Sequence, residues 1–251
     1  MGAGRIRRYL AEQQDALLEG SRLLAAADRS GVHPSRVAVR RARSTLRTFA
    51  PCFDTGARRQ LDAALVAHAR RLGTVRDHEV LVEVLAGQWA REDDGTPAGL
   101  RAWLSARLQA DLEAGWRETV ALLAAEDHDE LPRRFAAVLS APAGDGSVRK
   151  RAAHAARRAE HRLAAAGGDP EALHDARKAA KRARYAAEAV GDDDAAGQFR
   201  EVQRVLGAHH DLVVAAQWVL AAPVLPAVQP DARQLAVRLE AAAADLLADL
   251  P

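Results

Sequence analysis

The stretch "VHPSRVAVRRARSTLRTF", residues 32–49, decides the fold class that we expect for this chain. Its apolar residues recur at helical spacing, which predicts an amphipathic helix packed through Ala38, Ala42, Leu46 and Phe49. At about 100° per residue, positions i, i+3, i+7, i+10 and i+14 fall within roughly 80° of one another on a helix. These positions form a first basic stripe, with Arg41 on its flank: His33, Arg36, Arg40, Arg43 and Arg47.

A second stretch, "LHDARKAAKRARYAAEAV" at residues 173–190, repeats this order of histidine and bases at an offset of 141. Its apolar face is rich in alanine, and Glu188 stands where the first copy has Arg47. The same helical geometry therefore predicts a second basic stripe. This stripe consists of His174, Arg177, Lys181 and Arg184, with Arg182 on its flank.

Two further segments indicate that the repeat is a duplication. "LGTVRD" at residues 72–77 and "LGAHHD" at residues 206–211 share the pattern L-G-x3-D. Two ordered matches at nearly equal offsets predict two related helical halves, at residues 1–140 and 147–251, joined by the linker "SAPAGDGS". The period is too long for a solenoid repeat, so two packed bundles are expected.

Helical periodicity extends over almost the whole chain, and no strand or hairpin signal interrupts it. We therefore expect an all-α fold. In "GGDPEA", Asp169 is the expected N-cap and Pro170 the first helical residue. Helices are expected at residues 5–27, 33–50, 58–72, 75–90, 100–124, 133–139, 148–166, 170–190, 195–206, 212–221 and 231–249.

Composition excludes several classes of protein. The 251 residues are 49% hydrophobic and 28% charged, which is typical of a globular chain rather than a disordered one. The single cysteine excludes an internal disulfide framework. No signal peptide or apolar run of membrane-spanning length is visible, so we expect a cytoplasmic protein without a membrane partner.

The two stripes predict an anion-binding surface. Bases three or four residues apart repel one another by roughly 0.2–0.5 kcal/mol per pair, yet residues 33–47 contain no acid to relieve this. A solvated basic face neutralised by acids from other helices is the alternative, and it does not require a fixed order of bases. The recurring order favours phosphate binding, with His33 and His174 as donors in the first turns of their helices.

Other segments admit different chemistry. "HHD" at residues 209–211 and "DHD" at residues 127–129 resemble pieces of a metal-dependent phosphohydrolase, but arginines around His174 would repel a cation. His154 and His161, among four arginines, either extend the basic lining or lie on the surface. Asp77 and Asp211 are expected to be structural. We expect no metal, no cofactor and no catalytic residue.

The quoted stretches, together with "LGTVRDHEVL" and "VQRVLGAHHDL", resemble the CHAD (conserved histidine α-helical domain) family over essentially the whole chain. The resemblance implies two four-helix-bundle-like halves related by a pseudo-two-fold axis. It also implies a basic central cavity where the stripes face each other and bind inorganic polyphosphate, often at polyphosphate granules. The lining residues would be His33, Arg36, Arg40, Arg41, Arg43, Arg47, His174, Arg177, Lys181, Arg182 and Arg184.

Three alternatives to a polyphosphate binder remain open at this stage. A nucleic-acid binder would explain the arginines, although aromatic residues for base stacking are scarce at 4%. A metal-dependent phosphohydrolase would need a set of converging carboxylates. An adaptor could use the stripes to bind acidic protein tails.

Overall fold

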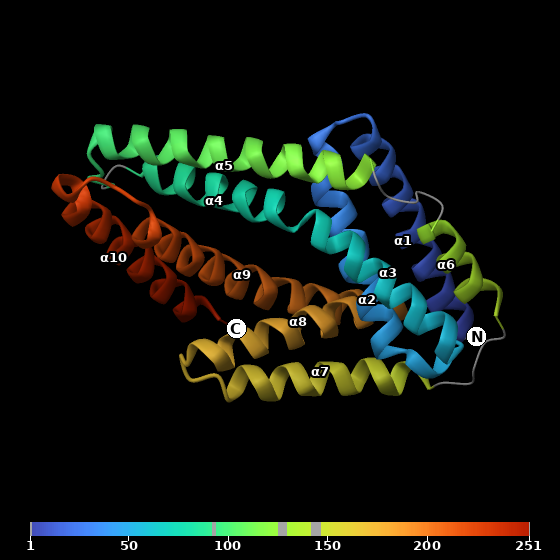
Figure 1. Cartoon of the computed structure of the whole chain (residues 1–251). Helices are drawn as coiled ribbons and strands as arrows, with labels where there is room; N and C mark the ends of the chain where they lie inside the picture. The colour runs from blue at the N-terminus through green and yellow to red at the C-terminus, as the bar shows by residue number, and fades with distance from the viewer. Residues whose placement is uncertain (1, 92–93, 125–129, 142–146, 251) are drawn as a thin grey trace. The chain divides into compact units, whose positions relative to one another are not determined.

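The computed structural model describes residues 2–91, 94–124, 130–141 and 147–250, and every regular element in this range is helical (Figure 1). The all-α prediction is therefore confirmed. Within the same residues no helix combines the length and apolarity needed to cross a membrane. The α-helices are α1 (Gly2–Ala25), α2 (Val32–Thr48), α3 (Thr55–Arg71), α4 (Gly73–Trp89), α5 (Ala98–Ala124), α6 (Glu130–Ser140), α7 (Val148–Ala164), α8 (Pro170–Val190), α9 (Asp193–Ala221) and α10 (Gln229–Leu246). Four short 3-10 helices accompany them: η1 (Arg29–Gly31), η2 (Ala50–Cys52), η3 (Pro226–Val228) and η4 (Leu247–Asp249).

Local sequence signals set the ends of α8. The Asp169 side chain accepts a hydrogen bond of 2.8 Å from the Ala172 amide, and Pro170 is the first helical residue, as predicted. Gly191 ends the helix with φ of 71°, a left-handed conformation that glycine adopts without the steric cost of a Cβ.

One predicted helix break is wrong, and two segments discussed above lie at least partly outside the described residues. Residues 195–206 and 212–221 were expected to be separate helices, but α9 is continuous from Asp193 to Ala221. Gly207 alone does not end a helix, because no proline follows it and the buried Val205, Leu206 and Ala215 keep packing on both sides. Residues 142–146 of the expected linker "SAPAGDGS" (140–147), and "DHD" at residues 127–129, lie outside the described residues.

Contacts divide the chain into two compact units, and each unit combines segments that are distant in sequence. Unit 1 comprises Met1–Gly73 and Arg117–Arg200, and unit 2 comprises Thr74–Trp116 and Glu201–Pro251. The units therefore cut across the expected halves at residues 1–140 and 147–251. Those halves describe a duplication of the sequence, and that duplication stays a prediction.

Unit 1 contains α1, α2, α3, α6, α7 and α8 around a core of its own. Ile6 and Leu10 from α1, Leu46 from α2 and Phe135 from α6 are almost fully buried together. The helices α7 and α8 form a closely packed antiparallel pair, and α1 packs along α2 (Figure 1). Unit 1 is the part that matters for the site, because it holds both basic stripes.

Unit 2 has a separate core from α4, α10 and the parts of α5 and α9 that belong to it. Leu85, Leu104, Val219 and Leu235 are fully buried there. Four helices with one apolar face each can bury a core of this kind without a sheet.

Candidate anion-binding site

The two stretches that carry the basic stripes fold as α2 and α8 and pack against each other inside unit 1. Their small residues make the close approach possible, because Ala38 and Ala42 of α2 and Ala183 and Ala186 of α8 are buried. The apolar faces predicted for the two helices are thus confirmed. Most of the bases on the opposite faces are half-buried, so the packing of the unit holds their side chains.

The first half of the α2 stripe lies beside α3. His33 is exposed in the first turn of α2, as predicted. Arg36 donates a hydrogen bond of 3.3 Å from its Nη1 to the Ala69 carbonyl near the end of α3. The Nε of Arg40 is buried and has no hydrogen-bond partner among the described residues. Such a donor favours an anion close by, since an unsatisfied buried polar group is costly.

The second half of the α2 stripe is neutralised by an acid from α3. Asp62 lies 2.9 Å from Arg43 and 3.1 Å from Arg47, measured between carboxylate oxygen and guanidinium nitrogen. Partial burial raises the pKa of Asp62, but the hydrogen bonds from both arginines outweigh this and leave the pKa below its ordinary value. Asp62 is therefore charged and partly cancels this end of the stripe.

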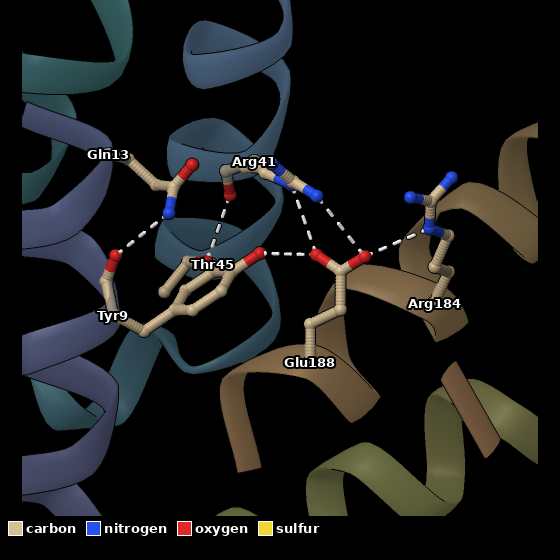
Figure 2. A network of polar contacts seen from close by, with 6 residues as sticks. All are labelled: Tyr9, Gln13, Arg41, Thr45, Arg184 and Glu188. Carbon is tan, nitrogen blue, oxygen red and sulfur yellow. Dashed lines mark hydrogen bonds and ion pairs between the residues drawn. The ribbon is translucent and has the colours of Figure 1, made fainter. Parts of the chain in front are cut away.

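A second acid, Glu188 of α8, connects three helices (Figure 2). Its carboxylate accepts hydrogen bonds from the Arg41 Nε at 3.0 Å and the Arg184 Nε at 2.9 Å. The Tyr9 hydroxyl of α1 donates a third, of 2.7 Å. Arg41 and Arg184 also make cation–π contacts with Tyr185. Their guanidinium carbons lie 5.9 and 5.8 Å from the centre of its ring.

Burial and charge act on this network in opposite directions. Burial would raise the pKa of Glu188, but the Tyr9 hydrogen bond and the charges of Arg41 and Arg184 hold the pKa below its ordinary value. Burial, and then the bond to Glu188, raise the pKa of Tyr9. Tyr9 is therefore a neutral donor to a charged carboxylate, and the network joins α1, α2 and α8.

The alternative that acids from other helices neutralise the stripes therefore holds for four of the bases. The sequence around residues 33–47 contains no acid, but α3 and α8 supply Asp62 and Glu188 across the helix packing. Within the described residues, these two acids hold Arg41, Arg43, Arg47 and Arg184.

The remaining bases of α8 differ in their surroundings. Arg177 and Lys181 are half-buried, and His174 is exposed. Because α8 begins at Pro170, His174 lies one turn into the helix rather than in its first turn, and that part of the prediction is wrong. His174 therefore lies beyond the first turn, where the free backbone N–H groups of the helix start are found.

Arg182 faces a different neighbour, helix α7. It lines a pocket of about 410 Å³ together with Arg47 of α2 and a row of bases from α7. Partial burial, and then the charges of Arg158 and Arg47, lower the pKa of Arg182. The bases that α7 contributes to the pocket are Lys150, Arg151, His154, Arg157 and Arg158.

The sequence carried a signal for this contribution from α7. The helix "VRKRAAHAARRAEHRLA" has eight basic residues or histidines and a single acid, Glu160. His154, which was expected either to extend the basic lining or to lie on the surface, is exposed and does line the pocket. The sequence pattern alone did not place these residues, because α7 has no counterpart in the quoted repeat.

A metal site would require several histidine, cysteine or carboxylate side chains that converge on one point. Among the described residues, no three or more histidine, cysteine, aspartate or glutamate side chains converge in a way that could bind one. The chemistry that unit 1 offers is that of guanidinium and ammonium groups, which bind oxyanions.

The fold and the basic residues define a helical domain with a cationic surface on one unit, and comparisons with known proteins identify its family. The model of the CHAD domain family matches residues 8–220, so this chain belongs to the CHAD domain family. No curated protein matches the sequence.

Two solved structures share the fold. PptA from Streptomyces chartreusis is 19% identical, with a TM-score of 0.78 over 99% of this chain and 98% of that one. The CHAD domain from the plant Ricinus communis is 23% identical, with a TM-score of 0.65 over 100% of this chain and 88% of that one. The arrangement of helices is therefore shared along the whole chain.

Proposed function

We propose that this protein binds inorganic polyphosphate, without catalysis, through the basic surface of unit 1. The observation that carries the proposal is that α2, α7 and α8 pack together in one unit and bring their bases to common pockets. The pocket that contains Arg47 and Arg182 has no acid among its described lining residues. Membership of the CHAD family supports the same ligand class.

Chemistry favours a linear phosphate polymer over other anions. Guanidinium groups bind phosphate oxygens by charge-assisted and often bidentate hydrogen bonds. A row of such groups matches a chain that repeats the same charged unit and has no base or sugar to be read. A surface rich in arginine and poor in carboxylates also favours binding over metal-dependent hydrolysis, for which carboxylate ligands are needed.

A calorimetric titration tests this function. Polyphosphate of defined length is titrated into the protein at fixed salt, and single-stranded DNA, RNA and a polyglutamate are compared at matched charge. We expect tight binding of polyphosphate and weaker binding of the other polymers. Equal affinity for nucleic acid would favour the nucleic-acid binder, and preference for polyglutamate would favour the adaptor.

Two companion measurements address catalysis and location. Phosphate release in the presence of Mg²⁺ or Mn²⁺ should stay at background, and turnover would refute a binding-only role. If binding directs the protein to polyphosphate granules, a fluorescent fusion should concentrate there in cells that accumulate polyphosphate and disperse when the polymer is degraded.

A further inference from the structure

Two contacts between α2 and α8 are equivalent in position, but one joins opposite charges and the other joins like charges. The sequence offset of 141 pairs Arg41 with Arg182 and Arg47 with Glu188. Arg41 contacts Glu188, and Arg182 lies near Arg47 in one pocket, so each contact is the other one transferred by the offset. A pseudo-two-fold relation between the helices would generate such a pair of contacts.

The two contacts differ because glutamate stands at one position and arginine at the other. At the first, burial would lower the pKa of Arg41, but the charge of Glu188 raises it above its ordinary value. At the second, the guanidinium groups of Arg47 and Arg182 repel each other. One corner of the helix pair is thus closed by an ion pair, and the other is left cationic.

Helix α7 adds to the charge at the cationic corner. At 100° per residue, Lys150, His154, Arg157 and His161 share one stripe of α7, and Arg151, Arg158 and Arg162 form a second stripe beside it. The other side of α7 carries the small residues Ala155 and Ala159, which are buried against its neighbours. The helices therefore approach closely, and the long basic side chains stand along the edge of the groove between α7 and α8.

The groove continues beyond the first pocket. A second pocket, of about 200 Å³, shares Arg158 and Arg182 with the first and adds Arg162 and Lys178. The one acid among its described lining residues, Asp175, lies 2.7 Å from both Arg162 and Lys178 and is thus already neutralised. From Lys150 to Arg162 the basic edge of α7 is about 18 Å long at 1.5 Å per residue.

Arg158 and Arg182 are the two bases that line both pockets of this groove, and no described acid pairs with either. Neither forms an ion pair or a side-chain hydrogen bond with another residue in the described part of the chain, whereas Arg47 is held by Asp62. A bound phosphate would replace the repulsion between the two guanidinium groups with attraction to a shared anion.

We infer that the groove between α7 and α8, with Arg158 and Arg182 at its centre and Arg47 at its end, is the principal phosphate subsite of this protein. The inference rests on the proposed function for the identity of the polymer. Under this inference the largest contribution to phosphate affinity comes from a face that includes only Arg47 and Arg182 of the sequence-predicted residues. The stripe residues Arg36 and Arg40 contribute less.

The test compares two variants that remove the same charge. Arg158→Ala/Arg182→Ala empties the centre of the groove, and Arg59→Ala/Arg200→Ala removes two exposed arginines of unit 1 that line neither pocket. Calorimetric titration with polyphosphate at fixed salt should show a loss of affinity of about tenfold or more for the groove variant, as expected for lost charge-assisted hydrogen bonds. The control should lose about threefold or less, through general electrostatics alone. A third variant, Arg36→Ala/Arg40→Ala, should fall between the two.

Charge reversal at the exposed Arg158 provides a fourth variant. Arg158→Glu places a carboxylate beside Arg182, as Glu188 lies beside Arg41, and should weaken binding more than Arg158→Ala does. Circular dichroism and thermal unfolding establish that each variant is folded. Equal affinity of the groove and control variants, with tight binding by the wild type, would overturn the groove and leave the proposed function standing. Absence of binding by the wild type would overturn both.

Discussion

The Tyr9 hydroxyl of α1 donates a hydrogen bond of 2.7 Å to Glu188 of α8, a residue 179 positions further along the chain. Because Arg41 of α2 shares that carboxylate, one acid fixes three helices of unit 1 relative to one another. The same acid neutralises two bases, Arg41 and Arg184, whose charges would otherwise add to the cationic surface of the unit. Stability and ligand affinity are therefore expected to change in opposite directions when Glu188 loses its charge.

Glu188→Gln tests this opposition. The amide keeps the shape and can still accept from Tyr9, but it no longer pairs with two cations. We expect the free energy of unfolding to fall by about 1–3 kcal/mol, because charge-assisted hydrogen bonds are lost in a half-buried place. Urea unfolding measures this, and calorimetry should show tighter polyphosphate binding.

Glu118→Gln is the matched control for Glu188→Gln, since Glu118 is an exposed acid of unit 1 that takes no part in the Glu188 network. It should leave stability nearly unchanged and alter affinity only slightly. If Glu188→Gln is as stable as this control, the network does not hold the helices together.

The pH dependence of stability should follow from the same carboxylate. The pKa of Glu188 lies below its ordinary value of 4.5 in the folded protein, so the unfolded chain takes up the proton first as pH falls. The stability contributed by Glu188 is thus complete above pH 4.5 and is lost as pH drops through the folded pKa. Asp62 acts in the same direction from its ordinary value of 3.8.

Urea unfolding at a series of pH values between about 6 and 3 measures this loss. We expect the difference in unfolding free energy between wild type and Glu188→Gln to be constant at the upper end and to shrink toward the lower end. A difference that does not change with pH would show that the charge of Glu188 is irrelevant to stability.

The junction between α1 and α2 gives a prediction about the fold alone. A Cβ built on Gly31 would lie 2.6 Å from the Gly20 carbonyl oxygen and 2.9 Å from the Leu23 Cβ. Backbone cannot move aside as a flexible side chain can, so Gly31→Ala should destabilise the protein by about 1–3 kcal/mol. Thermal unfolding measures the effect.

Gly197→Ala is the control for the Gly31 substitution. A Cβ at Gly197 meets nothing within 4 Å, and the residue lies inside α9. This change should be neutral or stabilise by up to about 1 kcal/mol, because alanine favours a helix interior. Similar melting temperatures for the two variants would contradict the close helix approach at Gly31.

Local signals in the sequence predicted the helices well, but they did not predict the ion pairs between residues far apart in the chain. Asp169, Pro170 and Gly191 determine both ends of α8 within one short segment, so the limits of that helix could be read directly. In contrast, the acid that neutralises Arg41 is 147 residues away, and only the packing of α2 on α8 brings it close. No pattern in a single helix contains that information.

The sequence did not predict which segments make up unit 1, for the same reason. The stripes on α2 and α8 followed from spacing, and both helices do lie in one unit. The unit nevertheless joins the first 73 residues to residues 117–200, a combination that depends on how the helices pack rather than on any break in the sequence. The basic face of α7 was visible as composition, but its place beside Arg182 was not.

Asp62→Asn should increase polyphosphate affinity at the cost of stability. Asp62 holds Arg43 and Arg47 at 2.9 and 3.1 Å, and its amide analogue would release both guanidinium groups to the cationic surface that Arg47 shares with Arg182. The gain should be several-fold at low salt and should shrink as salt rises, because the added attraction is electrostatic. The free energy of unfolding should fall by about 1 kcal/mol, since the ion pairs are partly exposed.

Asp15→Asn supplies the comparison for Asp62→Asn, because Asp15 is an exposed acid on α1 and lines neither basic pocket. Both variants change the net charge by the same amount, so a specific effect of Asp62 appears as the difference between them in calorimetric affinity. Combining Asp62→Asn with Arg47→Ala should remove most of the gain if Arg47 is the base that becomes available. A gain that persists in this double variant would assign it to Arg43 and would remove Arg47 from the binding surface.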